Sequence, residues 1–183
     1  MRTRDPAGKR RALVAAGLAL AERDGLSGLS VNRVVTAAGI AKGSFFHLFG
    51  DRASYLIELH RGFHDRLAAR TAAAIAGAEP GAGRLLTGTR AYLDGCLRER
   101  ATRALLVEAQ AEPAIVVEAA RRGRMFARIA EPDFAAMGCP HPPESARLWV
   151  VMVREVAVAE SESGAALDGL RAALRRYLGR GTT

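Results

Sequence analysis

The apolar residues of this chain recur every three or four positions over most of its length, which is the spacing of helices that bury one face. The pattern predicts helices at about 9–25, 52–76, 84–99, 113–129, 143–159 and 165–178, with a short one through Leu105 and Leu106 toward Pro113. Glu131 to Asp133, which contains a proline, is expected to kink or end its helix, and the polar segment 160–164 to separate the last two helices. The predicted fold class is all-α.

The segment 29–49 predicts two short helices around a glycine turn. Ser30 is a suitable N-cap for the first helix, and Gly39 suits the left-handed turn that follows it. The second helix is expected at about 42–48, where Ile40 can fill the angle between the two helices. With the helix predicted at 9–25, which ends at a glycine, this gives a three-helix head that contains a helix-turn-helix.

The outward face of the second short helix carries Lys42, Ser44 and His47, and these residue types bind phosphates and base edges in the major groove of DNA. Gly43 lies inside the same helix, where glycine costs about 1 kcal/mol relative to alanine. A close approach of the backbone to DNA would explain why glycine stands at this position despite that cost. The alternative is that Gly43 only reflects the high glycine content of the chain, which has 19 glycines. For His47, a partly buried aromatic is the alternative to a DNA contact.

The basic N-terminal arm, the apolar helix, the string VVTAAGIAKGSFFHLF and the following DRASYL together resemble the N-terminal domain of TetR-type transcriptional repressors. The resemblance covers about residues 9–57. The positions that carry it are Val34, Val35, Ala38, Gly39, Ile40, Gly43, Phe49 and Arg52, the last of which stands where the family usually has lysine.

This resemblance implies a DNA-binding domain at residues 1–52, joined by a long helix to a ligand-binding and dimerisation domain at 53–183. It implies a homodimer that regulates transcription at a palindromic operator in double-stranded DNA, as a repressor released when a small-molecule effector binds the body. The residues implied to lie at the DNA are Ser30, Asn32, Arg33, Lys42, Gly43, Ser44, Phe46, His47 and Arg52.

Three departures from the family pattern change the expected contacts. Ala41 stands where a capping serine is usual, which removes a side-chain cap worth roughly 1 kcal/mol. Phe46 replaces a tyrosine and lacks the hydroxyl that donates to a phosphate. Arg52 follows Asp51, a suitable N-cap, so a guanidinium and a helix N-terminus are expected to address one phosphate together.

The charge of the chain agrees with a polyanionic partner. Its formal net charge is +8, and the residues through Arg52 include nine basic and four acidic ones, or +5. The basic residues of the N-terminal arm are expected to follow the phosphate backbone or the minor groove, and they are Arg2, Arg4, Lys9, Arg10 and Arg11. For Arg2 and Arg4, a solubilising tail is the alternative.

The helix predicted at 143–159 is apolar around more than one face. Its apolar residues are Leu148, Trp149, Val150, Val151, Met152, Val153, Val156, Ala157 and Val158. Such a helix needs cover on all sides, whereas the helix at 165–178 offers a narrower leucine stripe. The hypothesis is that the last two helices of two subunits form a four-helix bundle about a two-fold axis.

Bulky or soft side chains on the body helices are candidates to line an effector pocket, with an ordinary core as the alternative. They are Phe63, Leu67, Tyr92, Cys96, Met125, Phe126, Trp149 and Met152. His60 and His64 have the spacing of a metal pair, but no third ligand stands nearby, so we expect exposed histidines and no metal or cofactor.

Other classes of protein fit less well. The chain has no nucleophile elbow, Walker loop, dinucleotide fingerprint or metal tetrad, so an enzyme is not expected. No apolar run reaches the ~20 residues of a membrane span and no signal peptide is evident, so a cytoplasmic protein is expected. The alternative function is a basic helical protein that coats DNA nonspecifically or binds membrane surfaces, which explains the charge but not the glycine turn.

Overall fold

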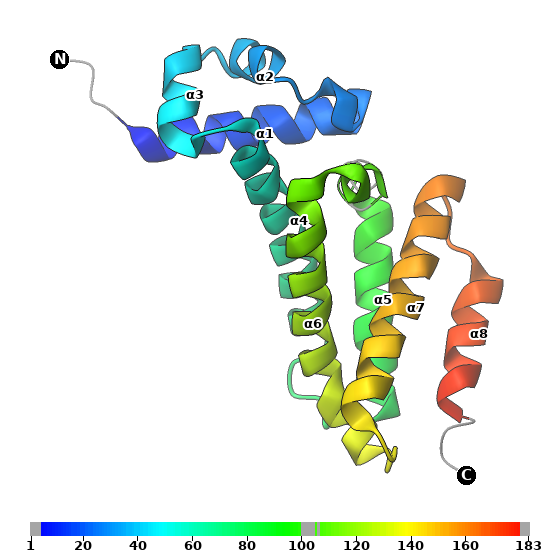
Figure 1. Cartoon of the computed structure of the whole chain (residues 1–183). Helices are drawn as coiled ribbons and strands as arrows, with labels where there is room; N and C mark the ends of the chain where they lie inside the picture. The colour runs from blue at the N-terminus through cyan, green and yellow to red at the C-terminus, as the bar shows by residue number, and fades with distance from the viewer. Residues whose placement is uncertain (1–4, 100–104, 106, 180–183) are drawn as a thin grey trace. The chain divides into compact units, whose positions relative to one another are not determined.

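The computed structural model describes residues 5–99, 105 and 107–179, and within these ranges the chain is built of helices and connecting turns, with no strand (Figure 1). The predicted all-α class is confirmed. None of the described helices is long and apolar enough to cross a membrane.

The chain divides into two compact units. The first unit comprises Met1–Phe63 with Ala101–Glu118, and the second comprises His64–Arg100 with Ala119–Thr183. The predicted domain boundary after Arg52 falls at the start of the helix Arg52–Ala74, of which residues 52–63 belong to the first unit and 64–74 to the second. The assignment of separate functions to 1–52 and 53–183 therefore stays a prediction.

The first unit contains α1 (Pro6–Asp24), η1 (Leu26–Gly28), α2 (Val31–Ala38), α3 (Lys42–Phe49), the start of α4 (Arg52–Ala74) and η3 (Glu108–Ala111). Its helices begin and end for identifiable reasons. The side chain of Asp5 accepts the amide proton of Gly8 at 2.8 Å, so α1 begins earlier than the predicted residue 9. Gly25 ends α1 with φ 68°, as predicted for this glycine.

The core of the first unit joins α1 to α4. Leu13, Phe45 and Tyr55 are each at most 1 % exposed. The hydroxyl of Tyr55 donates to the carbonyl oxygen of Leu13 at 2.7 Å, and burial raises the pKa of this phenol. Gly17 makes this approach possible, because a Cβ at that position would lie 1.9 Å from the Tyr55 hydroxyl oxygen.

The second unit contains most of the body helices. They are α5 (Ala82–Arg98), most of α6 (Pro113–Ala136), α7 (Pro142–Ser163) and α8 (Asp168–Gly179). α7 packs against both α5 and α8. Trp149 is 3 % exposed, and its indole Nε1 donates to the hydroxyl of Thr89 at 3.1 Å, which fixes α7 against α5.

Two predicted helix ends in the body are wrong. α6 does not end near Pro132 but continues to Ala136. The reason is Asp133, which is 3 % exposed and accepts bonds from Arg84 Nε at 2.7 Å and from the amide of Gly81 at 2.9 Å. These bonds hold the last turn of α6 against the start of α5, which outweighs the loss of one helical bond at the proline.

The polar segment 160–164 is not a loop, since α7 continues through Ser163 and ends at Gly164 with φ 70°. Glu160 is 1 % exposed and bonded to α8, so its polarity does not indicate exposure. α8 accordingly begins at Asp168 rather than at 165. Most of the short helix expected before Pro113 lies outside the described residues, whereas the start of α6 at Pro113 is confirmed.

The expectation of exposed histidines is also wrong. His60 is 0 % and His64 is 6 % exposed. Both lie on the buried face of α4, at helical spacing from Leu56, Phe63 and Leu67, so their position on the helix decides their burial. Within the described ranges no cluster of three or more potential ligands could hold a metal ion.

Candidate nucleic-acid interface

The turn between α2 and α3 has the backbone that the sequence predicts. The hydroxyl of Ser30 accepts the amide proton of Arg33 at 3.3 Å and caps α2. Gly39 is left-handed, with φ 63° and ψ 33°, and the amide of Ile40 bonds the carbonyl of Val35 at 3.0 Å. α3 begins after Ala41 without a side-chain cap, as expected from this alanine.

α3 is held in place by aromatic rings on one face only. Phe45 is 0 % and Phe49 is 7 % exposed, and both rings pack against Tyr55 with centroids 5.0 and 4.9 Å away. The opposite face carries His47, which is exposed, and Lys42 is exposed at the start of the helix. This polar face is therefore not packed inside the unit, which is the first requirement for a recognition helix.

Gly43 lies on the same open face. A Cβ built on it would meet nothing within 4 Å, so no packing inside the described chain requires glycine there. Ser44 beside it is partly buried, and Phe46 is 44 % exposed. The helix thus presents a small, uncovered stretch of backbone between a lysine and a histidine.

On α2, Ser30, Asn32 and Arg33 are exposed as well. Arg33 forms an ion pair with Asp24 of α1, which also accepts from Arg23 at 2.9 Å. The hydrogen bond from Arg23, together with that from Arg33, lowers the pKa of the Asp24 carboxyl below its ordinary value. Arg33 therefore reaches the surface already paired with a carboxylate.

Arg52 is also engaged within the first unit. Its Nε donates to the carbonyl of Leu29 at 3.1 Å and its Nη1 to Glu112 at 3.0 Å. Asp51 caps α4 by accepting the amide proton of Ser54 at 2.7 Å, and this bond lowers the pKa of the Asp51 carboxyl. The guanidinium and the helix N-terminus predicted to share a phosphate thus each have a partner inside the protein.

Of the predicted basic arm, Arg2 and Arg4 lie outside the described residues, and the other three residues belong to α1. Arg10 donates to Glu58 at 2.7 Å and to the carbonyl of Leu48 at 3.1 Å, and its guanidinium carbon lies 4.8 Å from the ring centroid of Phe49. Arg10 consequently joins α1, α3 and α4, and only Lys9 and Arg11 remain exposed without an ion pair among the described residues.

The residues predicted to line an effector site are only partly brought together. Phe63 lies in the first unit and the other seven in the second. Tyr92 and Phe126 pack edge to face with centroids 5.9 Å apart, and Tyr92 hydrogen-bonds Cys96. Leu67, Cys96 and Trp149 are buried, whereas Met125 and Met152 are partly exposed.

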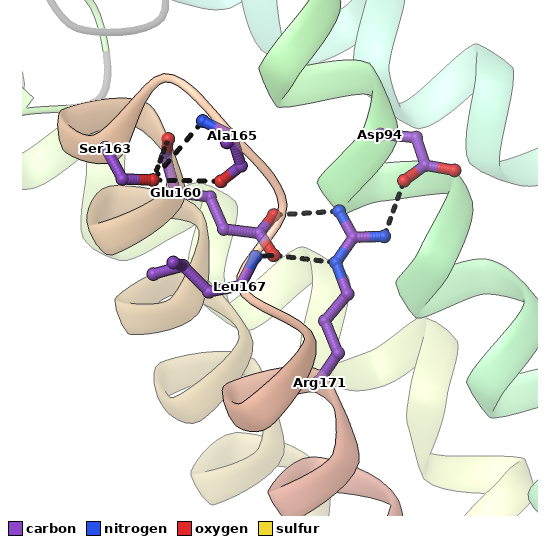
Figure 2. Close-up of polar contacts among 6 residues, drawn as sticks. All are labelled: Asp94, Glu160, Ser163, Ala165, Leu167 and Arg171. Carbon is purple, nitrogen blue, oxygen red and sulfur yellow. Dashed lines mark hydrogen bonds and ion pairs between the residues drawn. The ribbon is translucent and has the colours of Figure 1, made fainter.

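The C-terminal pair of helices combines an apolar surface with a polar cluster. Leu148 and Val151 of α7 are 66 % and 64 % exposed, and Tyr177 of α8 is 63 % exposed. In the polar cluster, Figure 2 shows the guanidinium of Arg171 between two carboxylates, and the bonds measure 2.6 and 2.8 Å to Glu160 and 2.6 Å to Asp94.

Sequence reasoning missed the carboxylate partners of Arg52 and Arg171. Glu112 lies 60 positions from Arg52, and Asp94 lies 77 positions from Arg171. Helical spacing on one element does not reveal such distant pairs. The sequence around Glu160 predicts a connecting segment, because this residue stands among serines and another glutamate.

A capped helix, a left-handed glycine turn and a second helix with one open polar face define a helix-turn-helix DNA-binding domain. Residues 13–59 match the family described as bacterial regulatory proteins, tetR family. The head of this chain is therefore similar to that of TetR-type transcriptional regulators, as its sequence motifs predicted.

Solved structures agree with this fold over nearly the whole chain. A transcriptional regulator from Rhodococcus sp. Rha1 has a TM-score of 0.77 at 22% identity, with 94% of this chain and 95% of that chain covered. The multidrug binding protein EbrR, complexed with imidazole, has a TM-score of 0.77 at 19% identity, with 94% and 93% covered.

A TetR-family regulator from Pectobacterium atrosepticum has a TM-score of 0.71 at 21% identity, with 98% of this chain and 95% of that chain covered. No curated protein sequence matches the chain. The structural likenesses therefore establish the fold, and the family match is confined to residues 13–59 of the head.

Proposed function

We propose that this regulator is a cytoplasmic homodimeric repressor that binds a palindromic operator and leaves it when a small molecule binds the body. The observation that carries the proposal is the exposed surface of α3, where Gly43 and His47 lie opposite the buried Phe45 and Phe49 and Lys42 is exposed at the first residue of the helix. Lys42 has no ion-pair partner among the described residues, so its charge is available to a phosphate or a guanine edge.

At the DNA, we assign two kinds of contact to the residues of the first unit. Lys42, Ser44 and Asn32 would read base edges and His47 would face the groove, whereas Ser30, Arg33, Phe46 and Arg52 would lie along the backbone. Gly43 would let the backbone of α3 approach the duplex closely, which agrees with the empty space around it. Residues 1–52 would then be the DNA-binding domain and 53–183 the ligand-binding and dimerisation domain.

Dimerisation would use the last two helices. Leu148 and Val151 are more than half exposed and lie three positions apart on α7, so they share one helix face, and an exposed apolar face is typical of an interaction surface. Two heads about 34 to 36 Å apart would read successive major grooves of a palindrome. Sedimentation should give twice the 19.4 kDa of one chain.

A matched pair of variants tests this dimer. Val151→Glu should yield monomers, whereas Val117→Glu, an exposed valine on α6, should leave the dimer intact. A wild-type protein that sediments as 19.4 kDa at micromolar concentration contradicts the dimer.

The effector would be a small molecule bound among the body residues named above. EbrR, whose fold this chain shares, is a multidrug binding protein, which supports a body able to hold such a ligand. A ligand releases the operator only if it binds the released conformation more tightly than the DNA-bound one.

The central experiment selects binding sites from random DNA and compares the selected duplex with a random duplex across salt concentrations. A specific regulator should prefer the selected palindrome by at least ~10³-fold. Lys42→Gln should lower the salt slope by about 1 per head, while Arg175→Gln, on α8, should not change it. Equal affinity for both duplexes would instead favour a nonspecific coat.

A further inference from the structure

Two glutamates at residues 108–112, far along the chain, contact the helix-turn-helix region at two places, Leu26 and Arg52. Glu108 of η3 and Glu112 at the start of α6 belong to the first compact unit. The amide of Leu26 donates to Glu108 Oε2 at 2.6 Å, and Arg52 Nη1 donates to Glu112 Oε1 at 3.0 Å. These two carboxylates are called the acidic clasp below.

Glu108 holds the junction between α1 and η1. The amide of Leu26 is the first of η1, and a carboxylate bond to it is charge-assisted. Gly25 before it has φ 68°, and a Cβ there would lie 2.7 Å from Glu108 Oε2. The carboxylate is therefore packed directly over this turn, and Leu26 itself is 7 % exposed.

Glu112 holds the other end of the same turn through Arg52. The Nε of Arg52 donates to the carbonyl of Leu29 at 3.1 Å, next to the N-cap of α2 at Ser30. A guanidinium can serve both partners at once because its donors form a rigid fork. The segment 26–29, which positions α2, is consequently tied at both ends to residues 108–112.

The acidic clasp is also part of the beginning of α6. The carbonyl of Glu112 accepts the amide proton of Ile115 at 2.9 Å, and Ile115 is 1 % exposed. A change at the first turn of α6 therefore moves the Glu112 carboxylate. Met125 and Phe126, two candidate effector contacts, lie further along this helix.

We propose that the acidic clasp is a positioning device through which the start of α6 sets the placement of the helix-turn-helix and the availability of Arg52 to DNA. The inference rests on the proposed function and adds its regulation. With the clasp closed, α2 is held at its N-terminus and Arg52 is directed by Glu112. With the clasp open, Arg52 is free to bind any phosphate and the N-terminus of α2 is no longer held. The affinity for the specific duplex relative to random DNA therefore falls.

The first test needs no DNA. In the full-length protein, amide hydrogen exchange over residues 26–38 should accelerate about threefold or more in Glu108→Gln and Glu112→Gln, a size expected for partly exposed charged contacts. Exchange in α5 and α7 should stay unchanged. Glu155→Gln, an exposed glutamate on α7, is the matched control. Unchanged exchange over 26–38 in both variants overturns the proposal.

The second test measures binding to the selected duplex and to a random duplex. Glu112→Gln should raise affinity for random DNA and lower the specific-to-random ratio by about threefold, since a charge near DNA affects both duplexes but misplacement affects only the selected one. A ratio unchanged within experimental error overturns the proposal, because loss of negative charge alone shifts both affinities equally.

A third variant guards against misfolding. Arg52→Lys keeps the positive charge, but an ammonium group cannot replace the planar guanidinium that donates to Leu29 and Glu112 at once. This variant should therefore reproduce the faster amide exchange over residues 26–38. Combining it with Glu112→Gln should add little, because both changes break one connection. If the wild type shows no preference for any duplex, the proposed function fails, while the exchange measurements still decide whether the clasp holds the head.

Discussion

Arg171 and Arg52 each bridge distant segments of this protein, and they do so in different environments. Arg171 in the second unit is 14 % exposed and lies between Glu160, 1 % exposed, and Asp94. Arg52 in the first unit is 38 % exposed and its partner Glu112 is 28 % exposed. Water has little access to the Arg171–Glu160 pair, whereas it reaches both Arg52 and Glu112.

Burial decides what each pair can do. A buried charge that loses its partner keeps its desolvation cost, so such a pair is expensive to break. A partly exposed pair is replaced by water at little cost and is screened by salt. Arg171 is therefore suited to fixing α8 permanently, and Arg52 to a contact that opens and closes.

The need for a permanent contact is clear from α8 itself. Leu174 is its only buried hydrophobic residue within the described part of the chain. Glu160 also accepts the amide proton of Leu167 at 2.9 Å, so one carboxylate holds both the start of α8 and its arginine (Figure 2). Hydrogen bonds and ion pairs, more than apolar packing, therefore attach α8 to the rest of the second unit.

The largest effect is expected from Arg171→Met, which leaves Glu160 buried without its guanidinium. The free energy of unfolding should fall by about 3–5 kcal/mol. Chemical denaturation measures this, with Arg175→Met on the exposed side of α8 as the control. Equal denaturation midpoints for the two variants would show that the Arg171–Glu160 pair contributes no more to the free energy of unfolding than an exposed arginine does.

Ala41→Ser should have an intermediate effect in the opposite direction. A serine N-cap can accept an amide proton of α3, which now has no side-chain cap, and should stabilise this helix by about 1 kcal/mol. Slower amide exchange within 42–49 is the measurement. Ala37→Ser, inside α2, is the control and should give no gain. No slowing after Ala41→Ser would refute the capping argument.

Glu112→Gln should reduce the free energy of unfolding by less than ~1 kcal/mol, because the pair is partly exposed. High salt should remove most of this small difference, whereas it should hardly change the effect of Arg171→Met. A loss as large as that of Arg171→Met would contradict the contrast between the two pairs.

The smallest effect concerns Cys96 and pH. Burial raises the pKa of this thiol to about 12, against 9.0 ordinarily. The raised value favours the protonated thiol in the folded state, so this group costs no stability below pH 9 and destabilises the fold only as pH rises toward 12. At pH 8 a thiol reagent should label Cys139, which is partly exposed, and not Cys96. Labelling of Cys96 in the native protein would contradict this.

Local signals in the sequence predicted much of the head. Ser30, Gly39 and Gly25 have side-chain or backbone preferences that act within a few residues, and all three end or begin helices as expected. The exposure of Lys42 and His47 on α3 agrees with the expected outward face, whereas Ser44, expected on the same face, is partly buried.

The remaining features depend on partners far along the chain. Glu160 and Asp133 are acidic but buried, because arginines from other helices satisfy them. His60 and His64 are polar types on an apolar face, where position outweighs residue type. The pairing of Arg52 with Glu112 has no local signal at all, since neither residue's neighbours indicate the other.

The hydroxyl of Tyr55 occupies the space that Gly17 leaves on α1, and it donates a hydrogen bond to the carbonyl oxygen of Leu13. Sliding or rolling of α1 along α4 would require this buried phenol to leave its position. We therefore expect α1 to follow a movement of the first turns of α4.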